Sequence, residues 1–232
     1  ADTGMQQAVI AALHSSWPQI PVLGEELSAA ERDAIMARSQ GHFWCLDPLD
    51  GTSNFASGIP YFAVSLALIE GGRVQAGLVL DPLAGEAFTA LAGQGAWLNG
   101  QPLRLPAQQP TQLRDAMAMV DLKRLPPALI VQLARACPYR SQRSFGAVAL
   151  DWCWLAAGRC QLYLHGGQKL WDYAAGQLIA AEAGVSGGLW EDWSGSPPTA
   201  LALTPRIGVA ATTPSLFHAW TDWLRAALAA QP

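Results

Sequence analysis

The chain has 232 residues, of which 51% are hydrophobic and 14% are charged, and its formal net charge is −4 at pH 7. This composition can fill the core of one large domain or of two lobes that share an interface, and it excludes a disordered chain. There is no long basic run, so binding to nucleic acid through a broad basic surface is not expected. No apolar stretch is long enough to span a membrane, and the first residues lack the basic region of a secretory signal. We therefore expect a cytoplasmic protein without a membrane partner.

The four cysteines carry no sign of a disulfide framework or of a zinc site. Their positions, 45, 137, 153 and 160, contain no Cys-x-x-Cys spacing, and each lies among apolar residues. We expect reduced, buried thiols, as in proteins of the cytoplasm.

The first half of the chain predicts an α+β lobe. Its elements, in chain order, are a helix over 5–15, an extended segment over 20–23, a helix over 29–38, a buried strand over 42–46 that stops at Asp47, and an antiparallel meander over 61–105. Ser28 and Glu31 form a capping box before the second helix. Within the meander, Asn99-Gly100 is the clearest two-residue hairpin turn.

The second half predicts an α/β lobe. Its elements are a strand over 116–120, helices over 127–136 and 145–157, a strand over 160–164, a helix over 172–183, a strand over 206–211 and a helix over 214–230. Asp172 begins the third of these helices and Gly184 follows it, which is the usual punctuation of a helix. Residues 106–111, PAQQPT, form the expected seam, so the predicted domains are 1–108 and 109–232.

Acidic residues stand where several predicted elements begin or end. Asp47 and Asp50 follow a strand, Glu25 and Glu26 follow another, and Asp172 begins a helix. Half-buried carboxylates cost free energy unless something pairs them, and no cationic residue is close in sequence to Asp47 and Asp50. Carboxylate, carbonyl and water oxygens are the ligands that Mg²⁺ prefers. The acids therefore indicate a site for divalent metal ions.

The segment that begins at Asp47 adds features of a phosphate site. Its three-residue spacing lets Asp50 converge with Asp47 while the Leu49 carbonyl points out between them. Gly51 allows a ligand to approach the backbone, and Thr52 supplies a hydroxyl at an expected helix start, where amides favour an anion. The same Asp-Pro-x-Asp-Gly pattern also occurs in ordinary loops, so the segment by itself leaves a loop and a site as alternatives.

Three separated segments together resemble the signatures of the inositol monophosphatase family. They are DPLDGTSNF at 47–55, Gly-Glu-Glu at 24–26, and WDYAAG at 171–176 followed by EAG at 182–184. The resemblance runs from residue 2 to about residue 210. It implies a layered αβαβα sugar-phosphatase architecture of the α+β class, with an antiparallel N-terminal sheet lobe and a smaller α/β C-terminal lobe.

The resemblance also implies a set of metal ligands. The groups that would hold two or three Mg²⁺ ions are Glu25, Asp47, the Leu49 carbonyl, Asp50 and Asp172. Asp47 would bridge two of the ions, and Glu25 would position the attacking water. Such ions neutralise phosphate and lower the pKa of bound water, so no Ser-His or Cys-His pair is needed. Inhibition by Li⁺ and a homodimer are further expectations from the resemblance.

Other positions match the phosphate and alcohol subsites of the family. Gly51 and Thr52 would bind the phosphate, and the Thr52 hydroxyl would help to orient the water. Asp2 aligns with a family aspartate that hydrogen-bonds this threonine. The residues that fall where the family lines its pocket for the alcohol part of the substrate are Gly146, Ala147 and Val148.

His165 departs from the family pattern. Inositol-specific members have at this position a glutamate that accepts hydrogen bonds from ring hydroxyls, whereas a neutral imidazole offers one donor and one acceptor. We therefore expect His165 to contact the substrate, which makes a different phosphorylated polyol, sugar or nucleotide an alternative to inositol phosphate; the other interpretation of His165 is an exposed loop histidine before Gly166. A second departure is length, because the family has a further helix before the position of Asp2.

These observations and the resemblance predict an Mg²⁺-dependent phosphomonoesterase that hydrolyses a small phosphorylated polyol, similar to inositol 1-phosphate, by attack of a metal-activated water. The substrate alternatives are a sugar bisphosphate, histidinol phosphate and a bisphosphonucleotide. A haloacid-dehalogenase-type phosphatase is disfavoured, because it requires Asp-x-Asp and the spacing here is Asp-x-x-Asp. A non-catalytic binding or regulatory protein is the other alternative, and it would be expected to lack a metal carboxylate. The expected partner is a small-molecule phosphate ester.

Overall fold

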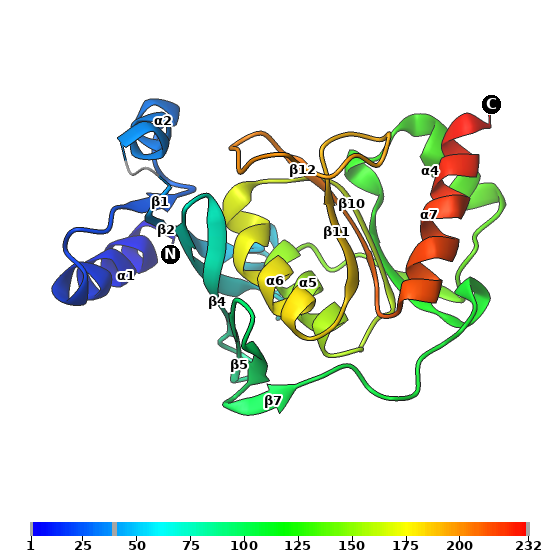
Figure 1. Ribbon diagram of the computed structural model, residues 1–232, viewed down its shortest axis with the longest axis horizontal. Helices are drawn as coiled ribbons and strands as arrows, with labels where there is room; N and C mark the ends of the chain where they lie inside the picture. Colours follow the sequence, from blue (N-terminus) through cyan, green and yellow to red (C-terminus); the bar gives the residue numbers. More distant parts are fainter. Residues whose placement is uncertain (1, 39–40, 231–232) are drawn as a thin grey trace.

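The computed structural model describes residues 2–38 and 41–230 and arranges them in five layers (Figure 1). A seven-stranded sheet and a five-stranded sheet lie on either side of a central layer of two helices, α5 (Val148–Ala156) and α6 (Leu170–Glu182). The outer layers are α1 (Asp2–Ser16) against the first sheet, and α4 (Pro127–Arg135) with α7 (Pro214–Ala229) against the second. The layered αβαβα architecture expected from the sequence is confirmed.

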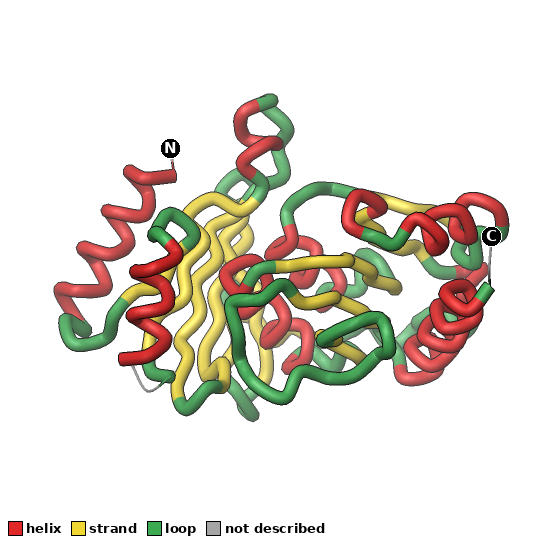
Figure 2. Tube along the Cα trace, turned by 90° about the horizontal axis from the view of Figure 1, so that it is seen from above, coloured by secondary structure: helices red, strands yellow, loops and turns green. Residues whose placement is uncertain are grey.

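The first sheet carries its strands in chain order. They are β1 (Val22–Gly24), β2 (Phe43–Asp50), β3 (Ala63–Glu70), β4 (Arg73–Asp81), β5 (Glu86–Leu91), β6 (Gly95–Leu98) and β7 (Gln101–Leu103). β1 and β2 are parallel, and every other neighbouring pair is antiparallel, with α1 lying alongside the sheet (Figure 2). Asn99, with φ 49°, and Gly100, with φ 75°, connect β6 to β7. Positive φ at both positions is what a type I′ hairpin turn requires, so the predicted meander and its turn are present.

β2 extends further than the sequence predicts. The expectation that this strand stops at Asp47 is wrong, because β2 continues to Asp50. Asp47 pairs with Ser65 of β3 and Asp50 pairs with Ala63, so β2 has one more residue than β3 between these two pairs. Pro48 lacks the amide hydrogen that a regular ladder needs, and the resulting bulge lets the pairing resume at Asp50.

The second sheet mixes parallel and antiparallel pairs. Its order is β11 (Ser186–Trp190), β12 (Arg206–Ala211), β10 (Leu162–Gln168), β8 (Met117–Asp121) and β9 (Ser141–Arg143). β8 is parallel to β9 and β10, and β12 is antiparallel to β10 and β11. The sequence does not predict β9 or β11, because β9 is a short polar segment and β11 begins with Ser-Gly-Gly, which has low strand propensity. β10 also runs to Gln168, past its predicted end at Leu164.

The remaining helices are α2 (Ala29–Arg38), α3 (Thr52–Ala56) and two 3-10 helices, η1 (Leu113–Asp115) and η2 (Leu122–Arg124). Three predicted helix starts are wrong, the first being that of α1, which begins at Asp2 rather than at 5. α5 begins at Val148 rather than at 145, since Gly146 has φ 85°, outside the helical region. α6 begins at Leu170, so Asp172 is its third residue, and the Asp172 carboxylate accepts the Lys169 N–H at 2.8 Å. No helix in the described part of the chain is long and apolar enough to cross a membrane.

The main hydrophobic core joins the two halves of the chain. It contains Phe88 of the first sheet, Trp152 and Ile179 of the helix layer, and Tyr163 of the second sheet, all of them buried. Helices of the second half pack on strands of the first, and the division at residue 108 stays a prediction. The cysteines are free, as expected, but the prediction that all of them are buried is wrong for Cys137, which is exposed.

The close approach of α6 to β4 generates a stability test. A Cβ added to Gly77 would lie 2.9 Å from the Ala175 carbonyl oxygen. Gly77→Ala should therefore lower the free energy of unfolding by about 1–3 kcal/mol, measured by urea denaturation. The control is Gly4→Ala, where the added Cβ meets nothing within 4 Å. Because Gly4 is an exposed helical position, this change should be neutral or stabilise by up to about 1 kcal/mol. Equal effects of the two substitutions would contradict the close packing.

Candidate active site

Most of the predicted site residues line one cavity of about 540 Å³. The cavity lies where the carboxyl ends of β2, β8 and β10 meet the starts of α3, α5 and α6. Its lining includes Glu25, Asp47, Leu49, Asp50, Gly51, Thr52, Gly146, Ala147, Val148, His165 and Asp172. A larger groove of about 630 Å³ runs beside β11, and none of the described residues that line it is acidic. The acids therefore identify the first cavity as the candidate active site.

The carboxylates share this cavity without a cationic partner. Within residues 2–38 and 41–230, no salt bridge involves Glu25, Asp47, Asp50 or Asp172. Burial raises the pKa of Asp47 and Asp50 well above the usual range, and the charges of neighbouring acids raise it further. Burial and the charge of Asp172 raise the pKa of Glu25, and burial raises the pKa of Asp172. The ionised acids repel one another, so the protein carries an electrostatic cost at this site until a counter-charge is bound.

Backbone amides fix two more of these carboxylates, in the way that Asp172 is fixed at the start of α6. The N–H of Leu49 donates to Asp47 Oδ1 at 2.9 Å. The N–H of Ala149, in α5, donates to Asp50 Oδ2 at 2.6 Å. Each amide restrains one oxygen of its carboxylate and leaves acceptor sites on the other oxygen for a ligand.

The donor groups fit a hard divalent cation in their chemistry. Across the described residues, no three Asp, Glu, His or Cys side chains form a group that could hold a metal ion by themselves. Mg²⁺ usually keeps several waters and takes only one or two carboxylates, so it does not need such an enclosure. The Leu49 carbonyl and the Thr52 hydroxyl line the same cavity as the acids. Carboxylate and carbonyl oxygens, the protein ligands that Mg²⁺ prefers, are therefore both available in this cavity.

Gly51 and Thr52 form the turn from β2 into α3. Gly51 has φ 89°, and a Cβ there would lie 3.0 Å from the Tyr61 carbonyl oxygen, so a larger residue would be strained at this position. The Thr52 hydroxyl donates to the Leu49 carbonyl oxygen at 3.1 Å. Because this bond uses the hydroxyl proton, the Thr52 oxygen is left as an acceptor.

Asp2 is the predicted site residue that does not line this cavity. It begins α1. Burial is the main cause that raises the pKa of Glu25 and of Asp47, the charges of other acids come next, and the charge of Asp2 adds a smaller effect. The hydrogen bond expected between Asp2 and Thr52 is not found in the described structure, where Thr52 bonds to Leu49 instead. A catalytic role of Asp2 stays a prediction.

Asn54 positions the site, and the sequence did not single it out. Its side-chain amide donates to the carbonyl oxygens of Tyr61 and Phe145, each at 2.7 Å. These bonds hold α3 beside the segment that contains Gly146 and Val148. Its only sequence signal is its place within the 47–55 segment.

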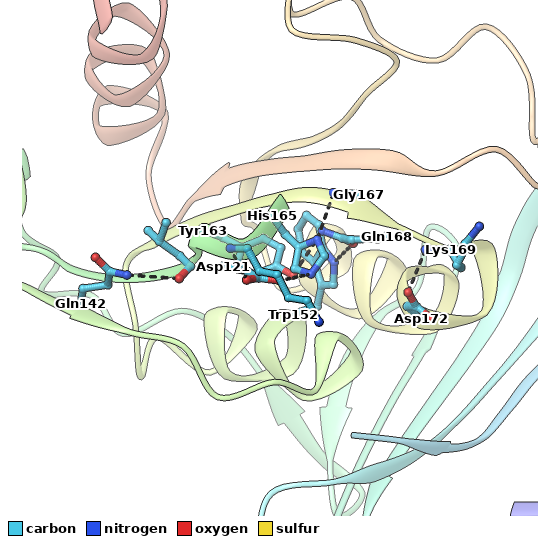
Figure 3. A network of polar contacts seen from close by, with 11 residues as sticks. Asp121, Gln142, Trp152, Tyr163, His165, Gly167, Gln168, Lys169 and Asp172 are labelled. Atoms are coloured by element: carbon cyan, nitrogen blue, oxygen red, sulfur yellow. Dashed lines mark hydrogen bonds and ion pairs between the residues drawn. The ribbon is translucent and has the colours of Figure 1, made fainter. Parts of the chain in front are cut away.

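His165 lies on β10 inside the fold, so the alternative of an exposed loop histidine is wrong. Its Nε2 lies 3.1 Å from Asp121 Oδ2, and its Nδ1 accepts the Gly167 N–H at 3.2 Å (Figure 3). The hydrogen bond from His165 lowers the pKa of Asp121. Asp121 also lines the cavity. Sequence reasoning missed it, although it directly follows the predicted strand over 116–120.

Three basic residues and one further buried acid complete the lining of the cavity. The basic residues, Lys123, Arg124 and Lys169, are called the basic rim and contribute positive charge to the same cavity as the acids. Asp151, in α5, is buried, and burial raises its pKa to about 8. The Tyr61 hydroxyl donates to Asp151 at 2.9 Å. The basic rim favours entry of an anion towards the acids, which a phosphate ester would require.

Comparison with known proteins identifies the family of this chain. Residues 1–228 match the inositol monophosphatase family. This chain belongs to that family. A Nus factor SuhB of Pasteurella multocida is 37% identical over 199 residues, 84% of this chain and 71% of the relative. Inositol monophosphatase 1 of Solanum lycopersicum is 35% identical over 231 residues, 97% of this chain and 81% of the relative. The solved structure of inositol monophosphate bound SaIMPase-II has a TM-score of 0.80 at 26% identity, covering 95% of this chain and 82% of that one.

The electrostatic cost of the acids in this inositol monophosphatase family member can be measured. Asp50→Asn keeps an oxygen to accept from Ala149 and removes one charge. It should therefore stabilise the metal-free protein near neutral pH by about 0.5–2 kcal/mol, measured by urea denaturation with a chelator. The pKa of Asp50 is raised in the folded protein, so the ionisation of Asp50 lowers the free energy of unfolding as the pH rises above the pKa of an aspartate in the unfolded chain. The free energies of unfolding of the two proteins should therefore converge towards about pH 4.

The matched control for this test is Asp222→Asn, at an exposed acid of α7, which should change the free energy of unfolding little. A less stable Asp50→Asn protein would contradict the electrostatic cost.

Proposed function

We propose that this protein is an Mg²⁺-dependent phosphomonoesterase that releases phosphate from a small phosphorylated polyol of the inositol 1-phosphate type. The observation that carries the proposal is a group of acids, Glu25, Asp47, Asp50 and Asp172, that form no salt bridge with any described residue and share a cavity with a basic rim. Family membership and the relative named inositol monophosphatase 1 support it. Two of these acids, Asp47 and Asp50, are buried at a cost in stability that a bound divalent cation would offset.

Two or three Mg²⁺ ions are the proposed cofactors. The groups that would hold them are the carboxylates of Glu25, Asp47, Asp50 and Asp172 and the carbonyl of Leu49. When bound, such ions neutralise the charge of the phosphate, lower the pKa of bound water and stabilise the leaving oxygen.

The residues of the chain orient the reactants. Glu25 holds the attacking water through its carboxylate, and the Thr52 oxygen, whose proton is donated to Leu49, accepts a second hydrogen bond from that water. Gly51 leaves the backbone open to the phosphate oxygens. The water displaces the alcohol in line, and the alcohol leaves with a proton that comes from the water through solvent. No phospho-enzyme is formed.

An aspartyl-phosphate mechanism fits the site less well. The sequence lacks the Asp-x-Asp spacing, and one oxygen of Asp47 is already bound by the Leu49 amide. Among substrates, esters with a second anionic group are the alternative within the same mechanism, because Lys123, Arg124 and Lys169 could bind that group.

A binding role is the second candidate function, because several relatives are named Nus factor SuhB. Such a role is compatible with hydrolysis. A protein that only binds a partner does not need buried acids without a counter-charge, which is why hydrolysis is proposed first. The homodimer and the expected lack of a nucleic-acid partner stay predictions.

The metal ligands are tested by neutral substitutions. Asp50→Asn and Asp172→Asn should each lower Mg²⁺-dependent phosphate release from myo-inositol 1-phosphate by about 10²–10³-fold while the fold is retained, because each removes a ligand charge. Phosphate release is measured with and without Mg²⁺, circular dichroism checks the fold, and Asp222→Asn is the control. Near-normal turnover of either variant would refute the metal assignment. Li⁺ should inhibit the wild-type protein by competing with Mg²⁺.

A further inference from the structure

His165 has no ring nitrogen left for a substrate. Its Nδ1 accepts the Gly167 N–H at 3.2 Å, which requires a neutral ring with the proton on Nε2. Nε2 then donates to Asp121 Oδ2 at 3.1 Å, and the His165 side chain is only 7% exposed (Figure 3). Any hydrogen-bonding effect of His165 on the substrate must therefore act through Asp121.

Asp121 presents its carboxylate to the cavity. It ends β8, directly beside His165 in the register of the parallel strand β10. Its side chain is 26% exposed, and its Oδ1 accepts the Lys123 N–H at 2.9 Å. An ionised carboxylate has about four acceptor sites, so about two remain after the bonds from His165 and Lys123. The carboxyl ends of parallel strands are also where open α/β sheets commonly bind their ligands.

Asp121 forms no salt bridge with the basic rim in the described part of the chain. Its neighbours Lys123 and Arg124 line the cavity. The hydrogen bond from His165 keeps the pKa of Asp121 below its ordinary value, so the carboxylate is ionised near neutral pH. Its remaining lone pairs are therefore strong acceptors for hydroxyl groups.

We propose that Asp121 selects the alcohol part of the substrate by accepting hydrogen bonds from its hydroxyls, and that His165 is the positioning residue that fixes Asp121. This inference rests on the proposed phosphatase function. Inositol-specific members are expected to place a carboxylate at the position of His165, and here the neighbouring strand supplies one instead. The substrate class is then a phosphate ester whose alcohol carries further hydroxyls, such as a polyol or sugar phosphate.

A purely structural role of Asp121 makes a different prediction. Its side chain also caps η2 through the Lys123 N–H. If Asp121 only supported η2, its substitution would lower activity on every ester by a similar factor. Two esters separate these cases, because myo-inositol 1-phosphate and cyclohexyl phosphate have the same ring size and differ in the ring hydroxyls.

The test compares kcat/KM for these two esters in the wild-type protein and in Asp121→Asn, both with Mg²⁺. The wild type should favour myo-inositol 1-phosphate. Asp121→Asn should lower kcat/KM for this ester by about 10–100-fold and for cyclohexyl phosphate by less than about threefold, because only the first ester loses hydrogen bonds to a charged group. Circular dichroism of both proteins checks that the fold is kept.

Substitutions of His165 test the positioning role. His165→Leu removes the donor to Asp121 and should lower the preference for myo-inositol 1-phosphate. His165→Gln keeps a side-chain N–H and should restore part of that preference. A structural role of the buried ring would make both substitutions equally harmful to both esters.

The outcomes separate this inference from the proposed function. If the wild type hydrolyses both esters and Asp121→Asn leaves their kcat/KM ratio unchanged, the role of Asp121 is refuted and the phosphatase function stands. A wild type that prefers cyclohexyl phosphate also refutes the role of Asp121. If the wild type releases no phosphate from either ester with Mg²⁺, the phosphatase function fails and the inference fails with it.

Discussion

The site depends on holding like charges together inside the fold. Asp47, Asp50 and Asp172 lie in one cavity, where burial raises the pKa of each. Each carboxylate is restrained by a backbone N–H, and for Asp50 that N–H belongs to Ala149 on another element, α5. Asp172 and the N–H that restrains Asp50 therefore join the acids of β2 only when the helix layer is docked on the first sheet. The stability of the whole fold therefore offsets the repulsion between these carboxylates.

Small residues set the distance at which this docking occurs. A Cβ on Gly77 would meet the backbone of Ala175, and a Cβ on Gly176 would lie 2.8 Å from Trp152 Cβ. The helix layer therefore packs directly on β4 and on itself, without room for larger side chains. Since Asp172 stands at the start of the same helix, this packing also fixes its depth relative to the acids of β2. Stability and ligand geometry are coupled through the same contacts.

Features that depend on neighbouring residues could be predicted from the sequence. Features that depend on contacts between distant segments could not. The hairpin at Asn99 and the acids at 47 and 50 could be recognised because each depends on a few neighbouring residues. The true end of β2 could not be recognised, because it is set by pairing with β3. Asp121 was missed for the same reason. Its partner His165 is distant in sequence and becomes a neighbour only when β8 pairs with β10.

The pairing of β8 with β10 places the residues proposed to select the alcohol on other strands than the acids proposed to bind metal ions. Asp121 and His165 are register partners on adjacent parallel strands. A carboxylate on β8 rather than β10 stands about 4.8 Å to one side, which is the spacing of neighbouring strands. That displacement changes which hydroxyl of a bound alcohol the carboxylate can contact. It leaves Asp50 on β2 and Asp172 on α6 where they are, so the alcohol pocket can change while the acids that would carry the hydrolysis stay fixed.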